Sequence, residues 1–357
     1  MPERSGRRHR VTISDIAQRA GVSKGAVSYA LNDRPGVSDE TRDRILAIAK
    51  ELGWYPNRAA RSLSAARADA CGLVLARPAK TLALEPFYME FIAGVETELS
   101  AQSVALTIQL VRDVDEEVSV YRRWWGERRV DGILLVDQRT DDPRVAEVLA
   151  LGLPAVVVGG PLADAALPSV WHDEASVLED AVRYLAALGH TRIARVAGVT
   201  DFVHTEKRTE AFRAIIHELS IDGEVVATDY TPESSARATR KLLSAPRPPT
   251  AIIYDSDLLA VTGLGVVQQM GLGVPDDVSI VGWDDSLISR VVHPPLTAIT
   301  RDIERYGSLS ARHLLRAIDG EAPGDVEAER GELTPRGSTA RRKAEVVKPT
   351  RRRASAG

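Results

Sequence analysis

The stretch TISDIAQRAGVSKGAVSYALN, residues 12–32, contains two short helix patterns separated by a tight turn. Thr12 is followed three residues later by Asp15, a capping pair in which the hydroxyl accepts a free backbone N–H and the carboxylate faces the positive end of the helix dipole. Gly21 supplies the backbone freedom that ends the first helix, and Ser23 is placed to cap a second. The stretch therefore predicts a helix-turn-helix.

The two predicted helices each have an apolar face. The apolar residues recur at helical spacing, and they are Ile13, Ile16, Ala17, Ala20, Val27, Ala30 and Leu31. The opposite face of the second helix carries Lys24, Gly25, Ser28 and Tyr29, a short polar set that can approach base edges and phosphates in a DNA major groove. An ordinary helical hairpin without a DNA role is the alternative for this stretch alone.

A third helix pattern follows over residues 37–53. Ser38 is its expected cap, and an apolar stripe closes a three-helix core with Ile45, Leu46, Ile48, Ala49 and Leu52. The next segment, residues 58–66, has Leu63 as its one large apolar side chain. Because such a segment buries little surface by itself, we expect it to be ordered only when it packs on a partner.

The charge of the chain is unevenly distributed. Residues 1–67 hold 13 Lys and Arg against 7 Asp and Glu, residues 68–335 hold 25 against 42, and residues 336–357 hold 8 against 1. The net charge of −4 thus conceals basic ends on an acidic body. A basic amino-terminal module suits phosphate binding, although a merely solvated basic end would have the same charge.

The composition excludes several classes of protein. One cysteine, Cys71, excludes an intramolecular disulfide and suits a reducing compartment. No apolar run resembles a signal peptide or a membrane span, so a cytoplasmic protein without membrane contact is expected. The histidines show no metal-ligand spacing, and no nucleophile with a base is evident, so we expect no metal, no cofactor and no enzyme activity.

From Cys71 onward, short apolar runs alternate with amphipathic segments of helical period. The runs, each interpreted as a buried parallel strand, are residues 72–76, 104–110, 132–136, 155–158, 193–197, 251–254 and 278–281. This alternation is typical of an α/β fold, and the number of strands favours two sheets over one.

The beginning of the chain resembles the headpiece and hinge of the lactose-repressor (LacI/GalR) family of bacterial transcription regulators. The resemblance covers residues 11–67 and rests on four motifs: T-x-x-D-I-A-x-x-A-G-V-S, V-S-x-x-L-N, V-S-x-x-T-R and L-G-x-x-P-N-x-x-A-R-S-L. It implies that the second helix lies in the major groove, that a dimer reads a near-palindromic operator, and that Leu63 inserts into the minor groove. The implied DNA-binding residues are Thr12, Ser23, Lys24, Ser28, Tyr29, Asn32, Asn57, Leu63 and Ser64.

The sequence departs from the family pattern on the second helix. Ala26 stands where the family commonly has threonine, Tyr29 stands where it often has arginine, and Gly25 has no side chain. Base discrimination is therefore expected from Lys24 and Tyr29. The operator sequence cannot be inferred from the operators of better-known members.

The resemblance continues through residue 339 with the family's effector domain, which is similar to periplasmic sugar-binding proteins: two α/β lobes that close on a ligand. Its motifs include Arg129-Val-Asp-Gly-Ile-Leu-Leu and Gly282-Trp-Asp-Asp. The predicted organisation is a basic extension (1–10), an all-α headpiece (11–56), a hinge helix (57–67), a two-lobed ligand-binding and dimerisation domain (68–339) and a disordered basic tail (340–357). The tail lacks leucine heptads, so we expect a dimer.

The resemblance also implies an effector site. Arg208 would grip a ligand, Asp284 would bind it, and Ser256 with Asp257 replaces the Asn-Asp pair that the family often has. The remaining candidates are the stacking residues Tyr230 and Trp283, and Phe87 or Tyr88 from the first lobe. Without the family, a surface ion pair is the alternative for Arg208 and Asp284.

Other candidates receive a structural interpretation. Trp124 and Trp125 are expected to pack in the core, and His172 and Asp173 belong either to the cleft or to a surface turn. The sequence thus predicts a DNA-binding repressor whose operator affinity is controlled by a small ligand, a sugar or sugar derivative. A sugar-binding receptor, or an enzyme on the same fold, is the alternative.

Overall fold

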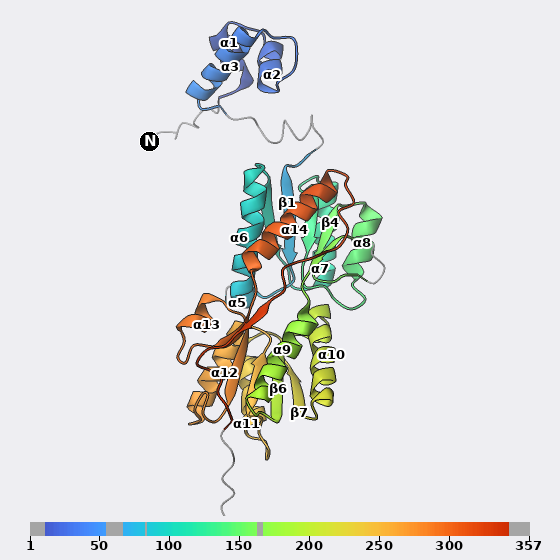
Figure 1. Cartoon of the computed structure of the whole chain (residues 1–357). Coiled ribbons are helices and arrows are strands. Elements are labelled where there is room, and N and C mark those ends of the chain that lie inside the picture. Colours follow the sequence, from blue (N-terminus) through green and yellow to red (C-terminus); the bar gives the residue numbers. More distant parts are fainter. Residues whose placement is uncertain (1–10, 55–66, 83, 163–166, 343–357) are drawn as a thin grey trace, which may run out of the picture. The chain divides into compact units, whose positions relative to one another are not determined.

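The computed structural model describes residues 11–54, 67–82, 84–162 and 167–342 (Figure 1). The chain divides into two units, residues 1–68 and 69–357, which are described separately. Asn57, Leu63 and Ser64 of the predicted hinge helix lie outside the described residues, as do the extension 1–10 and most of the predicted tail.

The first unit contains three helices, α1 (Ile13–Ala20), α2 (Lys24–Leu31) and α3 (Asp39–Glu51). The predicted capping box at Thr12 is present, and Asp15 Oδ2 accepts the backbone N–H of Thr12 at 2.7 Å. Gly21 ends α1 with φ 66°, and the Ser23 hydroxyl accepts the N–H of Ala26 at 3.1 Å. The predicted helix-turn-helix is therefore confirmed.

The core of the first unit contains most of the predicted apolar face. Ile16, Val27 and Ile45 are completely buried. Leu46, which we placed in the buried stripe, is 44% exposed, so that placement is wrong. The reason is helical geometry, because a residue adjacent to Ile45 lies about 100° around the helix from the buried face.

The second unit contains two lobes, each built on a six-stranded sheet. The first sheet has the order β11-β5-β4-β3-β1-β2, with β1 (Ala70–Leu75), β2 (Ala105–Leu110), β3 (Gly132–Leu135), β4 (Ala155–Val158), β5 (Ser169–Trp171) and β11 (Val326–Glu327). Its helices are α5 (Ala79–Leu82), α6 (Pro86–Ala101), α7 (Val114–Gly126), α8 (Pro143–Leu151) and α14 (Ile303–Ile318).

The second sheet has the order β12-β10-β9-β8-β6-β7, with β6 (Arg192–Ala197), β7 (Asp222–Ala227), β8 (Ala251–Tyr254), β9 (Ser279–Asp284), β10 (Thr297–Thr300) and β12 (Glu332–Thr334). Its helices are α9 (Glu174–Ala187), α10 (Val203–Glu218), α11 (Pro232–Leu243), α12 (Asp257–Gln269) and α13 (Leu287–Val291). Among the described strand pairs only β10 with β12 is antiparallel. The predicted α/β fold with two sheets is confirmed.

All seven apolar runs form strands, but the prediction differs from the structure in two ways. The run at 104–110 was expected to be buried, whereas β2 is a partly exposed edge strand that pairs only with β1 among the described strands. The shorter or more polar strands β5, β7, β10, β11 and β12 were missed.

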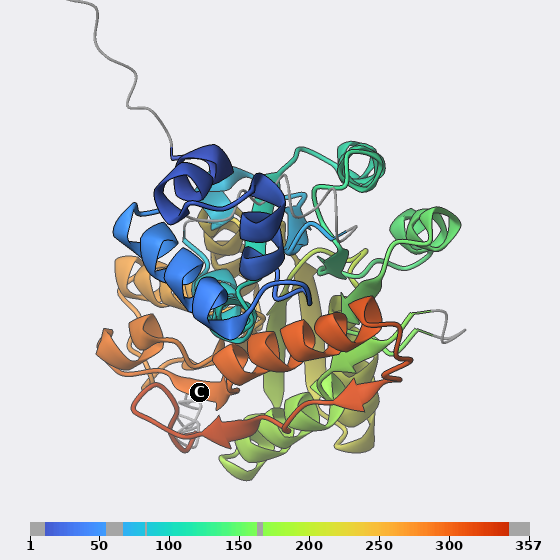
Figure 2. The same cartoon turned by 90° about the horizontal axis from the view of Figure 1, so that it is seen from above.

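The chain passes between the lobes three times, at residues 172–173, 301–302 and 328–331. After β10 in the second sheet, α14 returns to pack on α6 and on β3 and β4 of the first sheet (Figures 1 and 2). The last two strands are divided between the lobes, since β11 joins the first sheet and β12 joins the second. Each lobe is therefore built from segments far apart in the sequence.

Helices α6 and α14 approach closely where both have glycine. A Cβ on Gly94 would overlap the carbonyl oxygen of Glu304, and one on Gly307 would overlap the carbonyl oxygen of Phe91. Neither oxygen belongs to a flexible side chain, so an added methyl group must push the two helices apart.

We therefore expect Gly94→Ala to destabilise the second unit by about 3 kcal/mol. The expected fall in Tm is about 6 to 12 °C, measured by differential scanning calorimetry. The matched control is Gly126→Ala at the end of α7, where a Cβ meets no other atom within 4 Å and the Tm should not fall. An equal loss of stability in both variants would contradict the close approach.

Candidate functional site

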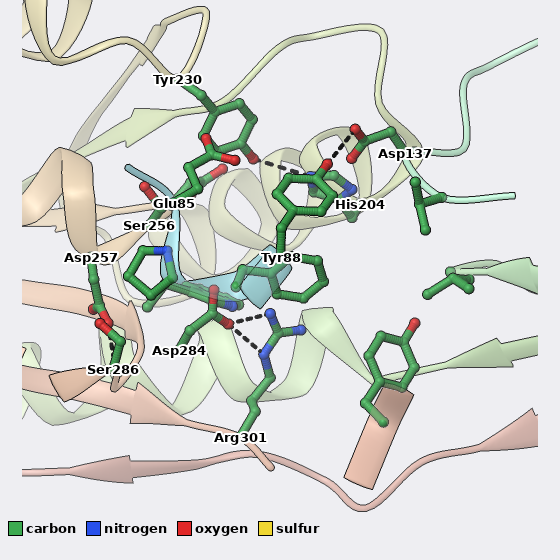
Figure 3. Close-up of a pocket in the computed structure, with 18 of the residues that line it drawn as sticks. Glu85, Tyr88, Asp137, His204, Tyr230, Ser256, Asp257, Asp284, Ser286 and Arg301 are labelled. Atoms are coloured by element: carbon green, nitrogen blue, oxygen red, sulfur yellow. Dashed lines mark hydrogen bonds and ion pairs between the residues drawn. The ribbon is translucent and has the colours of Figure 1, made fainter. Parts of the chain in front are cut away.

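A pocket of about 100 Å³ is lined by residues of both lobes (Figure 3). Several of these residues lie one or two positions after the end of a parallel strand: Arg77 after β1, Asp137 after β3, Asp255 after β8 and Arg301 after β10. The carboxyl ends of parallel strands meet at one edge of a sheet, which is where open α/β folds bind ligands.

All seven residues that we assigned to an effector site line this one pocket: Tyr88, Arg208, Tyr230, Ser256, Asp257, Trp283 and Asp284. Phe87 lines it as well. Tyr88 lies on α6 of the first lobe and the other six belong to the second lobe. The structure therefore brings together residues separated by up to about two hundred positions, and their role toward a ligand stays a prediction.

Arg208 is buried and already bound within the protein. Its Nε donates to Glu174 Oε2 at 2.7 Å, and its guanidinium carbon lies 3.7 Å from the centre of the Trp283 ring. The surface ion pair of Arg208 with Asp284 that we considered is wrong, because Asp284 accepts from Arg301 at 2.8 Å and all of these groups are largely buried. One face of Trp283 is thus covered by a guanidinium group.

Glu174 connects two guanidinium groups. Besides Arg208 at its Oε2, it accepts from Arg301 Nη1 at its Oε1, at 2.8 Å. Burial alone would raise the pKa of Glu174, but the two positive charges hold that pKa well below its usual range. Glu174 is the first residue of α9, immediately after the chain enters the second lobe.

Arg77 forms a second centre of charge. Its Nε and Nη2 donate to the carboxylate of Asp137 at 2.9 and 3.1 Å, and its guanidinium carbon lies 4.9 Å from the centre of the Tyr230 ring. The Tyr88 hydroxyl donates to the same carboxylate at 2.6 Å. Although burial opposes ionisation, Arg77 and these hydrogen bonds hold the pKa of Asp137 well below its usual range.

Two other carboxyl groups in the pocket have a raised pKa instead of a lowered one. Burial raises the pKa of Glu85 and that of Asp257 to about 7. Glu85 is the N-cap residue of α6, and Asp257 is the first residue of α12. In the part of the chain that the structure describes, Glu85 Oε1 and Asp257 Oδ1 have no hydrogen-bond partner.

The sequence reasoning missed part of the site: Arg77, Glu85, Asp137, Glu174, His204, Asp255 and Arg301. Four of these lie one or two positions after a strand, so the polar residues that follow each apolar run are a signal that the sequence contains. The polar residues after the predicted strands at 72–76 and 132–136 were not assigned to the site. Arg301 was missed because the strand that precedes it was not predicted. Glu174 and His204 are helix-start residues that no local pattern distinguishes.

Trp124 is completely buried and Trp125 packs partly buried beside it, as expected. Asp173 caps α9 by accepting the N–H of Ser176 at 3.1 Å, and His172 Nδ1–H donates to the backbone carbonyl of Glu329 at 3.0 Å. Neither residue lines this pocket, and both lie in the first crossing between the lobes, where His172 is buried and Asp173 is the N-cap of α9.

Two classes of site are not found in the described ranges. Among residues 11–54, 67–82, 84–162 and 167–342, no cluster of three or more His, Cys, Asp or Glu side chains is arranged to hold a metal ion. Within the same ranges, no helix combines the length and the apolar character that a membrane crossing requires.

The first unit presents the polar face of α2 to solvent. Lys24 and Gly25 are exposed, and Tyr29 is 45% exposed with its ring against Gly36, where a Cβ would lie 3.2 Å from a ring carbon. The Asn32 side chain donates to the Ser28 backbone carbonyl at 2.8 Å. Lys24 and Tyr29 are thus the long side chains that this face offers to a partner.

Comparison with known proteins gives consistent results for both units. Residues 12–57 match the model of bacterial regulatory proteins of the lacI family, and residues 182–339 match a periplasmic binding protein-like domain. The HTH-type transcriptional regulator CelR of Thermobifida fusca is 33% identical over 320 residues, 88% of this chain and 94% of that protein. The probable HTH-type transcriptional repressor ExuR of Bacillus subtilis is 30% identical, over 86% of this chain and 92% of its own.

Solved structures agree with these relatives. The lac repressor dimer bound to operator and an anti-inducer has a TM-score of 0.80 and 26% identity, covering 93% of this chain and all of that one. A CelR–cellobiose complex has a TM-score of 0.70 and 31% identity, covering 92% of this chain and all of that one. These relatives are transcription regulators and not enzymes, so the predicted class is confirmed. The chain belongs to the LacI family of bacterial transcription regulators.

Proposed function

We propose that this protein is a repressor that binds a near-palindromic operator as a dimer and changes its operator affinity when a sugar or sugar derivative occupies the pocket between the lobes. The observation that carries this proposal is the pocket itself. It is lined by both lobes and includes Glu174, which follows the first crossing, and Arg301, which begins the second. A ligand there contacts the segments about which the lobes would rotate.

The DNA contact is assigned to the exposed face of α2. Lys24 supplies a cation that can reach a guanine edge or a phosphate, and Tyr29 supplies a hydroxyl and a ring. Ser23, Ser28 and Asn32 are proposed to fix the position of the helix on the phosphates, with Thr12 at the start of α1. Leu63, outside the described residues, is the proposed minor-groove wedge.

A second copy of the chain is the proposed partner of the second unit. In the described residues, large apolar side chains are left exposed on both lobes, at Leu84 and Met89 of the first and at Leu287 and Val291 of the second. Exposed apolar surface of this kind is typical of an interaction site. The lac repressor structure, which shares the fold, is a dimer on its operator.

The chemistry of the pocket suits a polyol. Sugar hydroxyl groups both donate and accept hydrogen bonds, and the pocket presents guanidinium donors, carboxylate acceptors and the hydroxyl of Ser256. The rings that we assigned to stacking are partly used within the protein, since Arg208 covers Trp283 and Arg77 approaches Tyr230. Phe87 is the ring that we propose for the apolar face of a sugar.

The proposed coupling is a shift between two lobe arrangements. A ligand can shift such an equilibrium only if it binds the two arrangements differently. A sugar that takes hydrogen bonds from Arg208, Arg301 or Arg77 must alter ion pairs that exist without it. The change in lobe angle would then reach the hinge at residues 57–67.

The direct test is to select duplexes from a random DNA pool with the full-length protein, and then to titrate the selected duplex by fluorescence anisotropy with and without sugars. A near-palindromic consensus and a sugar-dependent affinity are expected. A sugar that binds should also raise the Tm. Recovery of no consensus sequence would contradict the operator proposal.

Lys24→Ala should relax discrimination at one symmetric pair of operator positions by roughly 10-fold and lower the affinity. The measurement compares selected duplexes with single-position variants, and Lys50→Ala, an exposed lysine in the last turn of α3, is the control. A uniform loss over all variants with a shallower salt dependence would assign Lys24 to the phosphates instead.

Arg208→Lys keeps the positive charge but loses the planar guanidinium group that binds Glu174. We expect this variant to separate operator binding from the response to ligand. Operator affinity without ligand should stay within about threefold of wild type, whereas the response should need at least about 10-fold more sugar. Arg183→Lys is the matched control, since Arg183 forms a surface ion pair with Glu218. An unchanged ligand response in folded Arg208→Lys dimers would remove Arg208 from the site.

A further inference from the structure

The charges in and beneath the pocket are nearly, but not completely, balanced. Four guanidinium groups can each be matched with a different carboxylate at 2.9 Å or less: Arg77 with Asp137, Arg195 with Asp255, Arg208 with Glu174, and Arg301 with Asp284. Buried charges are tolerated when they are paired in this way. These four pairs therefore contribute no net charge.

Glu85 and Asp257 are two further carboxyl groups that remain after the four guanidinium groups have been paired. Their exposed fractions are only 6% and 2%. Glu85 lies 3.6 Å from Arg77, which already binds Asp137 at closer range, and Asp257 Oδ2 accepts the backbone N–H of Ser286 at 2.6 Å. One oxygen of each carboxyl group has no hydrogen-bond partner in the described residues.

No other residue lining the pocket supplies the missing positive charge. The described lining residues include no lysine. His204 is neutral near pH 7, because burial lowers its pKa to about 4. With both carboxyl groups ionised, the carboxylates of the pocket therefore outnumber the guanidinium groups paired with them by two. Figure 3 shows Glu85 and Asp257 among the side chains that line it.

We propose that the effector is cationic, an amino sugar whose ammonium group is bound by the surplus carboxylates of Glu85 and Asp257. An ammonium group has three donors and no acceptor, and an ionised carboxylate only accepts, so the two are complementary. A uronate or a sugar phosphate would add a like charge to the same cavity. This inference rests on the proposed function, in which a sugar occupies the pocket.

The first experiment tests the surplus charge without any ligand. Glu85 faces Arg77, Asp137 and Asp284, and Asp257 faces Asp284 with Arg336 at longer range. Because the folded-state pKa of Glu85 is raised to about 7, the folded state keeps a proton that the unfolded chain loses above its own pKa of about 4.3. The stabilising effect of that proton is therefore present at low pH and lost as the pH rises through 7.

Glu85→Gln should accordingly raise the Tm at pH 8 and leave it nearly unchanged at pH 5, relative to wild type. Glu233→Gln, at an exposed position on α11, is the control and should change neither value. A lower Tm of Glu85→Gln at pH 8 would mean that the ionised group is stabilised in the folded protein, and the proposal would be overturned.

The second experiment measures binding by isothermal titration calorimetry with matched triads of probes: glucose, glucosamine and glucuronate, and the galactose and mannose equivalents. In at least one triad the amine should bind 10-fold or more tightly than the neutral sugar and the acid. Asp257→Asn and Glu85→Gln should each reduce the ratio of amine affinity to neutral-sugar affinity at least 10-fold. A neutral or acidic member that binds as tightly as its amine would overturn the inference and leave the sugar effector standing.

Proton release provides an independent readout. An ammonium group lowers the pKa of the carboxyl groups that bind it, so amine binding at pH 6.5 should release protons, seen as different heats in phosphate and in Tris buffer. Amine affinity should also rise between pH 5 and 7. Equal heats in the two buffers would overturn the inference. If no member of any triad binds, the sugar effector is rejected together with it.

Discussion

The pocket depends on one buried carboxylate, that of Glu174, which accepts from Arg208 and Arg301 at 2.7 and 2.8 Å. Removing a charge of this size from water costs several kcal/mol, which is offset only when all partners are in place. Glu174 follows the first crossing between the lobes and Arg301 begins the second. The ion pairs of Glu174 therefore hold the first two crossings together and form part of the pocket wall at the same time.

Much of the fold could be predicted because each local pattern agreed with the final structure. The apolar runs at 132–136 and 251–254 became β3 and β8, which are buried on both faces. By contrast, β7 is an exposed edge strand with the sequence Asp-Gly-Glu-Val-Val-Ala, and β11 has two residues. Such strands are defined by pairing with a distant neighbour, which no single window of sequence contains.

The site was predictable only in part, for a similar reason. Arg208 and Asp284 were found through the family motif, and both line the pocket. Their partners Glu174 and Arg301 were missed, because these ion pairs join residues 34 and 17 positions apart on different elements, which leaves no local signal. The headpiece was easier, since Gly21 and Ser23 act within a few residues of their own position. Ion pairs between distant elements are thus the part of the site that could not be predicted from local sequence.

The shared ends of the two lobes also determine the order in which the protein becomes functional during synthesis. The three-helix unit is complete by residue 68, whereas β12, the last strand of the second sheet, ends at Thr334. At about 5 to 20 residues per second, roughly 15 to 50 s separate the two events. A nascent or prematurely terminated chain can thus have its helix-turn-helix while it still lacks a complete second unit.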